Sequence, residues 1–134
     1  MTLKELSQLY YLTREVERDR ARLADLRAKA TSPKIPGYSS LPRDSTAENQ
    51  LEKYVAAISE LEALIAEKML RCIDERKRLE YYIAGIQDSL TRQIFTLRFV
   101  DGLKWSQIAM RVGGNNTAAG VKMVCYRYIQ RNQA

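Results

Sequence analysis

The chain has 134 residues, the size of one ordinary domain, and its hydrophobic content of 46% excludes wholesale disorder. No apolar run approaches the roughly 18 residues that a membrane span needs, and no signal-peptide stretch opens the chain. We therefore expect a cytoplasmic protein without a membrane partner. Two cysteines and no histidine argue against a zinc site and for a reducing compartment.

The positive charge is concentrated at the C-terminal end. The net charge is +6 overall, and residues 85–134 contribute seven basic and two acidic side chains, a net +5. Residues 1–30 add +2 and residues 31–84 add −1. Because neutralisation of phosphates supplies most non-specific DNA affinity, the last 50 residues are the candidate DNA footprint.

Residues 2–30 are predicted to form one helix. Thr2 and Glu5 have capping-box spacing. A heptad seam follows, with Asp19 as its one polar member; the seam consists of Leu9, Leu12, Val16, Asp19, Leu23, Leu26 and Ala30. Residues 31–45 hold all three prolines and four serines, and this composition predicts a loop.

A second, longer helix is expected to begin near Ser45, which has capping-box spacing with Glu48, and to continue to Gly85. Its apolar stripe comprises Leu51, Val55, Ile58, Leu61, Ile65, Met69, Cys72, Leu79, Ile83 and Ile86. Forty helical residues span about 60 Å, against about 43 Å for the first helix. We expect an antiparallel hairpin, or coiled coil, that leaves part of the stripe free and also forms a homodimer.

Three short helices are predicted after Gly85, at about 88–100, 104–112 and 117–131. The Asp-Gly pair at 101–102 and the Gly-Gly-Asn-Asn run at 113–116 separate them as turns. Trp105, Ile108, Ala109 and Val112 form one apolar face, and Val121, Val124, Cys125 and Tyr128 form the next. Two short amphipathic helices joined by a tight turn predict a helix-turn-helix. A third helix that carries Leu90, Ile94, Leu97 and Phe99 would close the core.

The second helix of such a unit enters the major groove of DNA. The predicted contact residues are Ser106, Gln107, Asn115, Asn116, Thr117, Ala118, Ala119, Lys122, Met123, Tyr126, Arg127 and Arg131. Lys122 and Arg127 are the strongest candidates, because nothing in the helix's own packing requires cations there. Alternative interpretations remain open: residues 115–117 as turn and cap residues, Tyr126 as cover for the core edge, and Trp105 as core.

The segment DGLKWSQIAMRV, residues 101–112, resembles the C-terminal helix-turn-helix of sigma-70-type factors, which reads the −35 promoter element. The resemblance rests on Gly102, Leu103, Trp105, Ile108 and Ala109. The whole chain resembles phage and prophage transcriptional regulators with a sigma-70 region 4-like C-terminus. This resemblance implies regulation of late phage genes, and it leaves open whether RNA polymerase is a partner. The connection from Gly113 to Val121 is about two residues longer than the usual turn.

The sequence thus predicts an all-α protein, with a long helical hairpin over 1–86 and a helix-turn-helix domain over 87–134. Its expected function is sequence-specific binding of double-stranded DNA, and it is not expected to be an enzyme or to hold a metal or cofactor. Two alternatives are a phage DNA-packaging protein, similar to a small terminase subunit, and a helical protein-interaction adaptor. No Gly-rich phosphate loop or metal-binding carboxylate cluster is found in the sequence.

Overall fold

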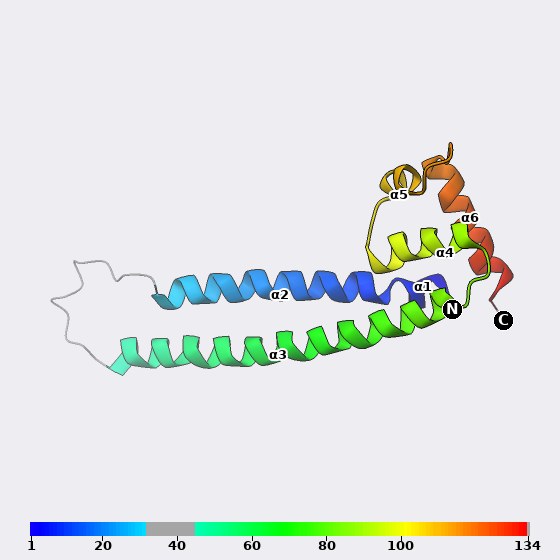
Figure 1. Ribbon diagram of the computed structural model, residues 1–134. Helices are drawn as coiled ribbons and strands as arrows, with labels where there is room; N and C mark the ends of the chain where they lie inside the picture. The colour runs from blue at the N-terminus through cyan, green and yellow to red at the C-terminus, as the bar shows by residue number, and fades with distance from the viewer. Residues whose placement is uncertain (32–44, 134) are drawn as a thin grey trace. The chain divides into compact units, whose positions relative to one another are not determined.

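The computed structural model describes residues 1–31 and 45–133, with side chains from residue 48 onward in the second range. These residues are almost entirely helical and include no strand (Figure 1), which confirms the predicted all-α class. The elements are α1 (Leu3–Leu6), α2 (Gln8–Thr31), α3 (Ser45–Ala84), α4 (Ser89–Phe95), η2 (Thr96–Val100), α5 (Trp105–Val112) and α6 (Ala118–Arg131).

The first predicted helix is interrupted at Ser7, which separates α1 from α2. The Ser7 hydroxyl donates a hydrogen bond to the Leu3 carbonyl at 2.8 Å, and such side-chain bonds compete with the helical backbone pattern. Thr2 caps α1 as expected, because its hydroxyl accepts from the Glu5 backbone N–H at 3.2 Å. Residues 32–44 of the predicted loop lie outside the described residues. The side chain of Ser45, which the second predicted capping box requires, is also outside them.

The chain folds as two compact units. One comprises residues 14–70, and the other combines residues 1–13 with the residues from Arg71 onward. The second of these units contains residues from both sides of the predicted division at 86.

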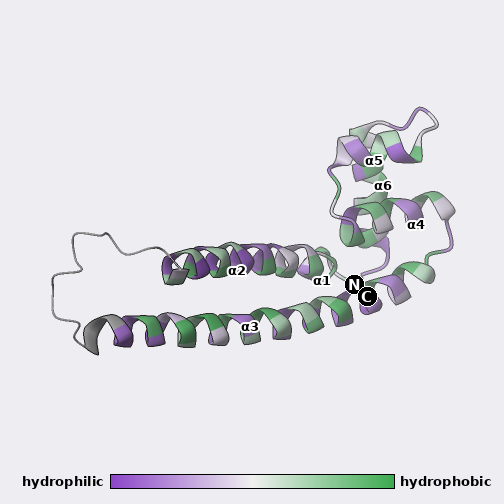
Figure 2. Ribbon diagram, turned by 60° about the vertical axis from the view of Figure 1, so that its left-hand side comes forward, coloured by the Kyte–Doolittle hydropathy of each residue, from purple (hydrophilic) through white to green (hydrophobic). Residues whose placement is uncertain are grey.

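In residues 14–70, α2 and α3 run antiparallel. Arg27 pairs with Glu62 at 3.3 Å and Asp19 pairs with Lys68 at 2.7 Å, so residues later in α2 meet residues earlier in α3. Val16, Asp19 and Leu23 are buried, as expected for members of the predicted seam. Figure 2 shows hydrophilic and hydrophobic residues alternating along both helices.

The predicted stripe of α3 is only partly buried. Leu61 and Ile65 are buried, whereas Leu51, Val55 and Met69 are 51%, 58% and 40% exposed. Met69 lines a shallow pocket with Leu23 and Ile65, and its neighbour Lys68 occupies the position that faces Asp19. Leu51 and Val55 precede the part of α3 that pairs with α2, which agrees with the expectation that part of the stripe stays free.

The other unit has one continuous hydrophobic core. Leu6 and Leu9 from the N-terminal segment, and Leu79 and Ile83 from the end of α3, lie in the same buried cluster as α4, η2, α5 and α6. From these last elements the cluster takes Ile94, Phe95, Phe99, Ile108, Ala109, Val121, Cys125 and Ile129. The N-terminal residues therefore help to form the core on which α6 rests.

Across the described part of the chain, no helix combines the length and apolar character that crossing a membrane requires.

Candidate nucleic-acid interface

Helix α4, which contributes to the core under α5 and α6, begins at the N-cap residue Asp88. The Asp88 carboxylate accepts hydrogen bonds from the Thr91 hydroxyl at 2.7 Å and the Thr91 backbone N–H at 3.0 Å. These two bonds hold the pKa of Asp88 below its ordinary value. Arg92, one turn later, donates to the Ile86 carbonyl at 2.8 Å. Arg92 thus stabilises the connection between α3 and α4.

A second arginine fixes the connection between η2 and α5. The Arg98 guanidinium donates to the Leu103 carbonyl at 2.9 Å and lies 4.3 Å from the centre of the Trp105 ring. Gly102 has a φ of +70°, a conformation that favours glycine. Two of the seven C-terminal cations, Arg92 and Arg98, therefore serve the fold.

Helix α5 buries Ile108 and Ala109 and exposes its opposite face. Trp105 is half-buried and packs against the core, with its ring 6.0 Å from that of Tyr126, edge to face. The interpretation of Trp105 as a core residue is therefore confirmed. The Gln107 side chain caps the helix start by accepting from the Lys104 backbone N–H at 2.9 Å.

The connection between α5 and α6 is a tight turn with unusual backbone angles. Gly113, Gly114 and Asn115 have φ values of +66°, +63° and +64°, which suit glycine and asparagine. The Asn116 amide donates to the Gly113 carbonyl at 2.6 Å. Thr117 caps α6, because its hydroxyl accepts from the Gly120 backbone N–H at 3.0 Å. Asn115 and Asn116 thus lie in the turn and Thr117 caps α6, as the turn-and-cap interpretation predicts.

Helix α6 is anchored by Val121, Cys125 and Ile129, all of which are buried. Burial raises the pKa of the Cys125 thiol to about 12, so this cysteine packs as a small apolar residue. Val124 and Tyr128 are half-buried beside them. The predicted inward face of α6 is confirmed, with Ile129 as an added member.

The face of α6 opposite this anchor is exposed and contains small and apolar residues between cations. Ala119 and Arg127 are exposed, and Met123 is 52% exposed. Lys122 and Arg127 are five residues apart and lie about 140° from each other around the helix, one on each flank of Met123. Lys122 also lies 5.7 Å from the centre of the Tyr126 ring.

The predicted contact residues differ in their exposure. Nine of the twelve are exposed, namely Ser106, Gln107, Asn115, Thr117, Ala119, Lys122, Met123, Arg127 and Arg131. Ala118, Asn116 and Tyr126 are half-buried. Tyr126 packs against the core, which agrees with its alternative interpretation as cover for the core edge.

Two exposed cations, Lys104 and Arg111, are not among the predicted contact residues and contribute only to the net charge of residues 85–134. Lys104 directly precedes α5, and Arg111 lies one turn after Gln107 on the same exposed side. Both are exposed cations at the ends of the helix predicted over 104–112, and that combination of charge and place is the signal that could have identified them. They extend the candidate interface from α6 to α5.

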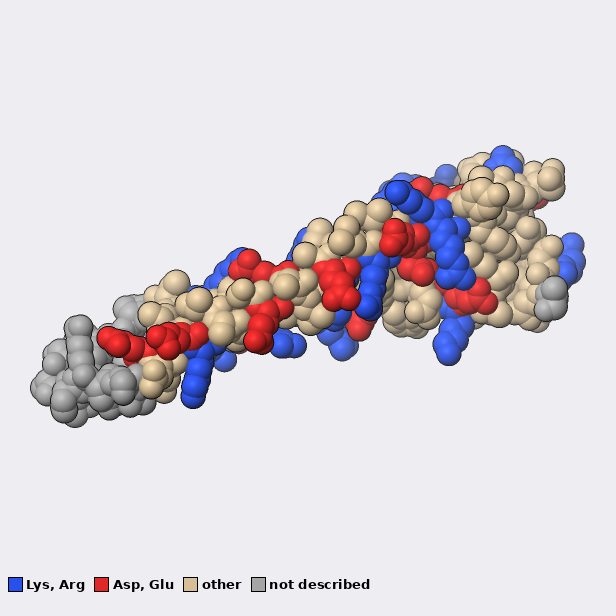
Figure 3. All heavy atoms as spheres, turned by 90° about the horizontal axis from the view of Figure 1, so that it is seen from below, with Lys and Arg blue, Asp and Glu red and all other residues tan. Residues whose placement is uncertain are grey.

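The electrostatic environment of this surface differs from that of the long helices. Residues 85–133 form no ion pair, whereas α2 and α3 contain several in their described parts, such as Arg76–Glu80 at 2.9 Å. Figure 3 shows acidic and basic side chains intermixed along the long helices. The cations of α5 and α6 are therefore not neutralised within residues 85–133.

No group of three metal-binding side chains occurs in the residues that the structure describes. Comparisons with protein-family models, curated proteins and solved structures found no match to the chain. The surface of α5 and α6 is therefore the candidate functional site.

Proposed function

We propose that the protein binds double-stranded DNA sequence-specifically, with α5 and α6 acting as a helix-turn-helix and α6 as its recognition helix. The observation that carries the proposal is the exposed face of α6. On that face Lys122 and Arg127 flank Met123 and Ala119 and have no carboxylate partner among residues 85–133.

The spacing of these side chains suits a helix lying in the major groove, which is about 12 Å wide. A groove-bound helix faces the base edges along its centre and the two phosphate backbones along its flanks. Ala119 and Met123 would face base edges, where apolar groups contact the thymine methyl. Lys122 would reach one backbone or a guanine, and Arg127 and Arg131 would reach the other backbone.

The residues around the turn would fix the position of α6 on the DNA. The first backbone N–H groups of a helix favour a phosphate, because they lack intrahelical partners and lie at the positive end of the helix dipole. Ser106, Gln107, Asn115 and Thr117 are exposed beside or before such helix starts. We assign them to backbone contacts, together with Lys104 and Arg111.

The biological role that we propose is regulation of transcription, in a phage or prophage context, with RNA polymerase as a partner. This part of the proposal depends on the sigma-like residues Gly102, Leu103, Trp105, Ile108 and Ala109. The long helices would form a coiled-coil hairpin that carries the DNA-binding domain.

The test is binding of the full chain to duplex fragments of the source genome across a salt series. The test variant is Lys122→Ala with Arg127→Ala. The control variant is Arg22→Ala with Lys77→Ala, which removes the same charge from exposed positions on α2 and α3. We expect tight binding to one fragment, a loss of at least about tenfold in the test variant, and no comparable loss in the control.

Two results would contradict the proposal. One is the absence of any binding by the folded protein at low salt. The other is an equal loss in both variants, which would show that only net charge matters and not the surface of α6.

A further inference from the structure

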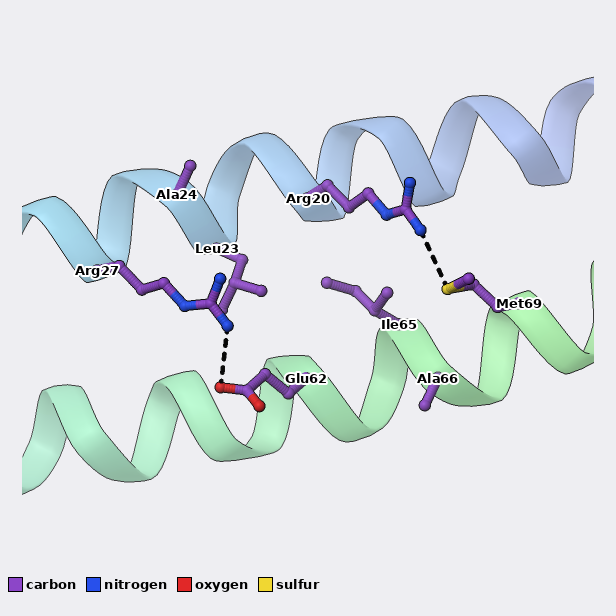
Figure 4. Close-up of a pocket in the computed structure, with 8 residues that line it drawn as sticks. All are labelled: Arg20, Leu23, Ala24, Arg27, Glu62, Ile65, Ala66 and Met69. Atoms are coloured by element: carbon purple, nitrogen blue, oxygen red, sulfur yellow. Dashed lines mark hydrogen bonds and ion pairs between the residues drawn. The ribbon is translucent and has the colours of Figure 1, made fainter.

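A groove lies between α2 and α3 within residues 14–70. Its apolar lining includes Leu23 and Ile65, with Ala24 and Ala66. The remaining lining residues are longer side chains, namely Arg20, Arg27, Glu62 and Met69. In Figure 4, Leu23 and Ile65 lie between the two helices, Arg27 is bonded to Glu62 and Arg20 is bonded to Met69. The groove is therefore apolar at its base and has a basic rim.

Arg20 is the unneutralised charge of this rim. Its guanidinium contacts the Met69 sulfur at 3.3 Å and no carboxylate among the described residues. Arg27, by contrast, is paired with Glu62 at 3.3 Å. An occupant that carries an acidic group beside an apolar side chain would match this rim in both shape and charge.

The same chain carries such an occupant at the beginning of α3. Leu51 and Val55 are 51% and 58% exposed, one turn apart, and the neighbouring Glu48 and Glu52 are exposed and form no ion pair with described residues. Arg27 pairs with Glu62 in antiparallel helices, so α2, which ends at Thr31, lies opposite α3 only from about residue 58 onward.

The groove and these apolar residues lie on the same side of α3. Leu51 and Met69 are eighteen residues apart, about five full turns of an α-helix. Val55 precedes the groove residue Glu62 by seven residues, about two turns. In a two-fold dimer, a patch at one end of a shared face contacts the groove at the other end of the partner's face, and the reverse contact forms at the same time.

We propose that two copies of the chain pair through this face, with the α3 helices antiparallel and the two-fold axis near Ser59. Leu51 and Val55 of each copy occupy the groove of the other, and Glu48 and Glu52 neutralise Arg20 of the other copy. Ser59 is small and lies midway between the two patches, where the helices approach most closely. This assembly is independent of the proposed DNA binding.

The test is the molar mass of the full chain by sedimentation equilibrium or light scattering, without DNA. We expect a dimer for the wild type. Leu51→Asp with Val55→Asp should weaken dimerisation by at least about 100-fold, because it places carboxylates in the apolar groove. Leu64→Asp is the matched control, since Leu64 is also exposed but lies about 140° away around α3. It should remain dimeric.

Exchanging the charges tests whether Arg20 of one copy contacts Glu48 and Glu52 of the other. We expect the variant Arg20→Glu to be monomeric. The variant that combines Glu48→Arg with Glu52→Arg should also be monomeric, because in either variant like charges face each other in the dimer contact. A mixture of the two variants should form a heterodimer, because both contacts again join opposite charges. A monomeric wild type, a dimer that survives Leu51→Asp with Val55→Asp, or a mixture that stays monomeric would overturn the proposal.

Discussion

Lys68 of α3 donates a hydrogen bond to the Asp19 carboxylate of α2 at 2.7 Å, and both side chains lie within the seam that the two helices share, 18% and 11% exposed. Polar groups at seam positions specify the register of paired helices at a cost in stability. The one polar interruption in the heptad pattern of α2 is thus matched by a cation on α3.

Removing one partner of this pair should destabilise the protein. Asp19→Asn removes the nearer of the two carboxylates around the Lys68 ammonium and leaves only Glu15, at 4.0 Å, so we expect a loss of about 1–3 kcal/mol in the free energy of unfolding by urea. Asp25→Asn is the control, because Asp25 pairs with Lys29 on an exposed surface; it should change stability by less than about 0.5 kcal/mol. Equal effects of the two substitutions would contradict a special role for the seam pair.

The N-terminal segment should be necessary for the stability of the unit that contains α6. Leu6 is fully buried in the core that includes Phe95 and Cys125, so Leu6→Ala should cost about 2–5 kcal/mol. Leu3→Ala, at an exposed position of the same short helix, should cost much less. If Leu6→Ala unfolds at the same urea concentration as the wild type, this result would contradict the place of Leu6 in the core with Phe95 and Cys125.

The two cysteines should differ in reactivity toward thiol reagents. Cys125 is buried and its pKa is raised to about 12, so at neutral pH it offers almost no thiolate and little access. Cys72 is only half-buried. We expect one rapidly labelled thiol in the native protein and two in denaturant. Rapid labelling of Cys125 in a Cys72→Ser variant would contradict the packing described for α6.

Acid should weaken the start of α4. The pKa of Asp88 is lowered by its bonds to Thr91, so the unfolded state binds the proton more tightly than the folded state. The contribution of Asp88 is present above the ordinary aspartate pKa of about 4 and is lost as the pH falls through the lower folded value. Asp88→Ala should therefore reduce the loss of stability on acidification, measured by urea unfolding from pH 6 downward. A steeper acid loss in that variant would contradict the assignment.

Much of the helical organisation could be predicted from local signals. The bounds of α3, α5 and α6 follow from glycine and capping positions such as Gly113 and Thr117, and the buried side of α2 follows from its heptads. These signals act over a few residues and need no knowledge of the tertiary structure.

The features that could not be predicted depend on contacts between distant residues. Arg92 and Arg98 count as surface charge in the sequence, yet they bond to the carbonyls of Ile86 and Leu103. The place of Leu6 in the core with Cys125 likewise joins segments more than a hundred residues apart. Periodicity identifies an apolar face, but it does not identify the segment that covers it.

The most direct test of DNA binding through α6 is the salt dependence of affinity for one tightly bound duplex. Each phosphate contact should contribute about −0.9 to the slope of log K against log salt concentration. Arg127→Ala should therefore reduce the slope by about one contact, whereas Arg22→Ala, on the exposed surface of α2, should leave it unchanged. A slope that is the same in the wild type and Arg127→Ala, or equally reduced in both variants, would contradict the assignment of this helix to DNA.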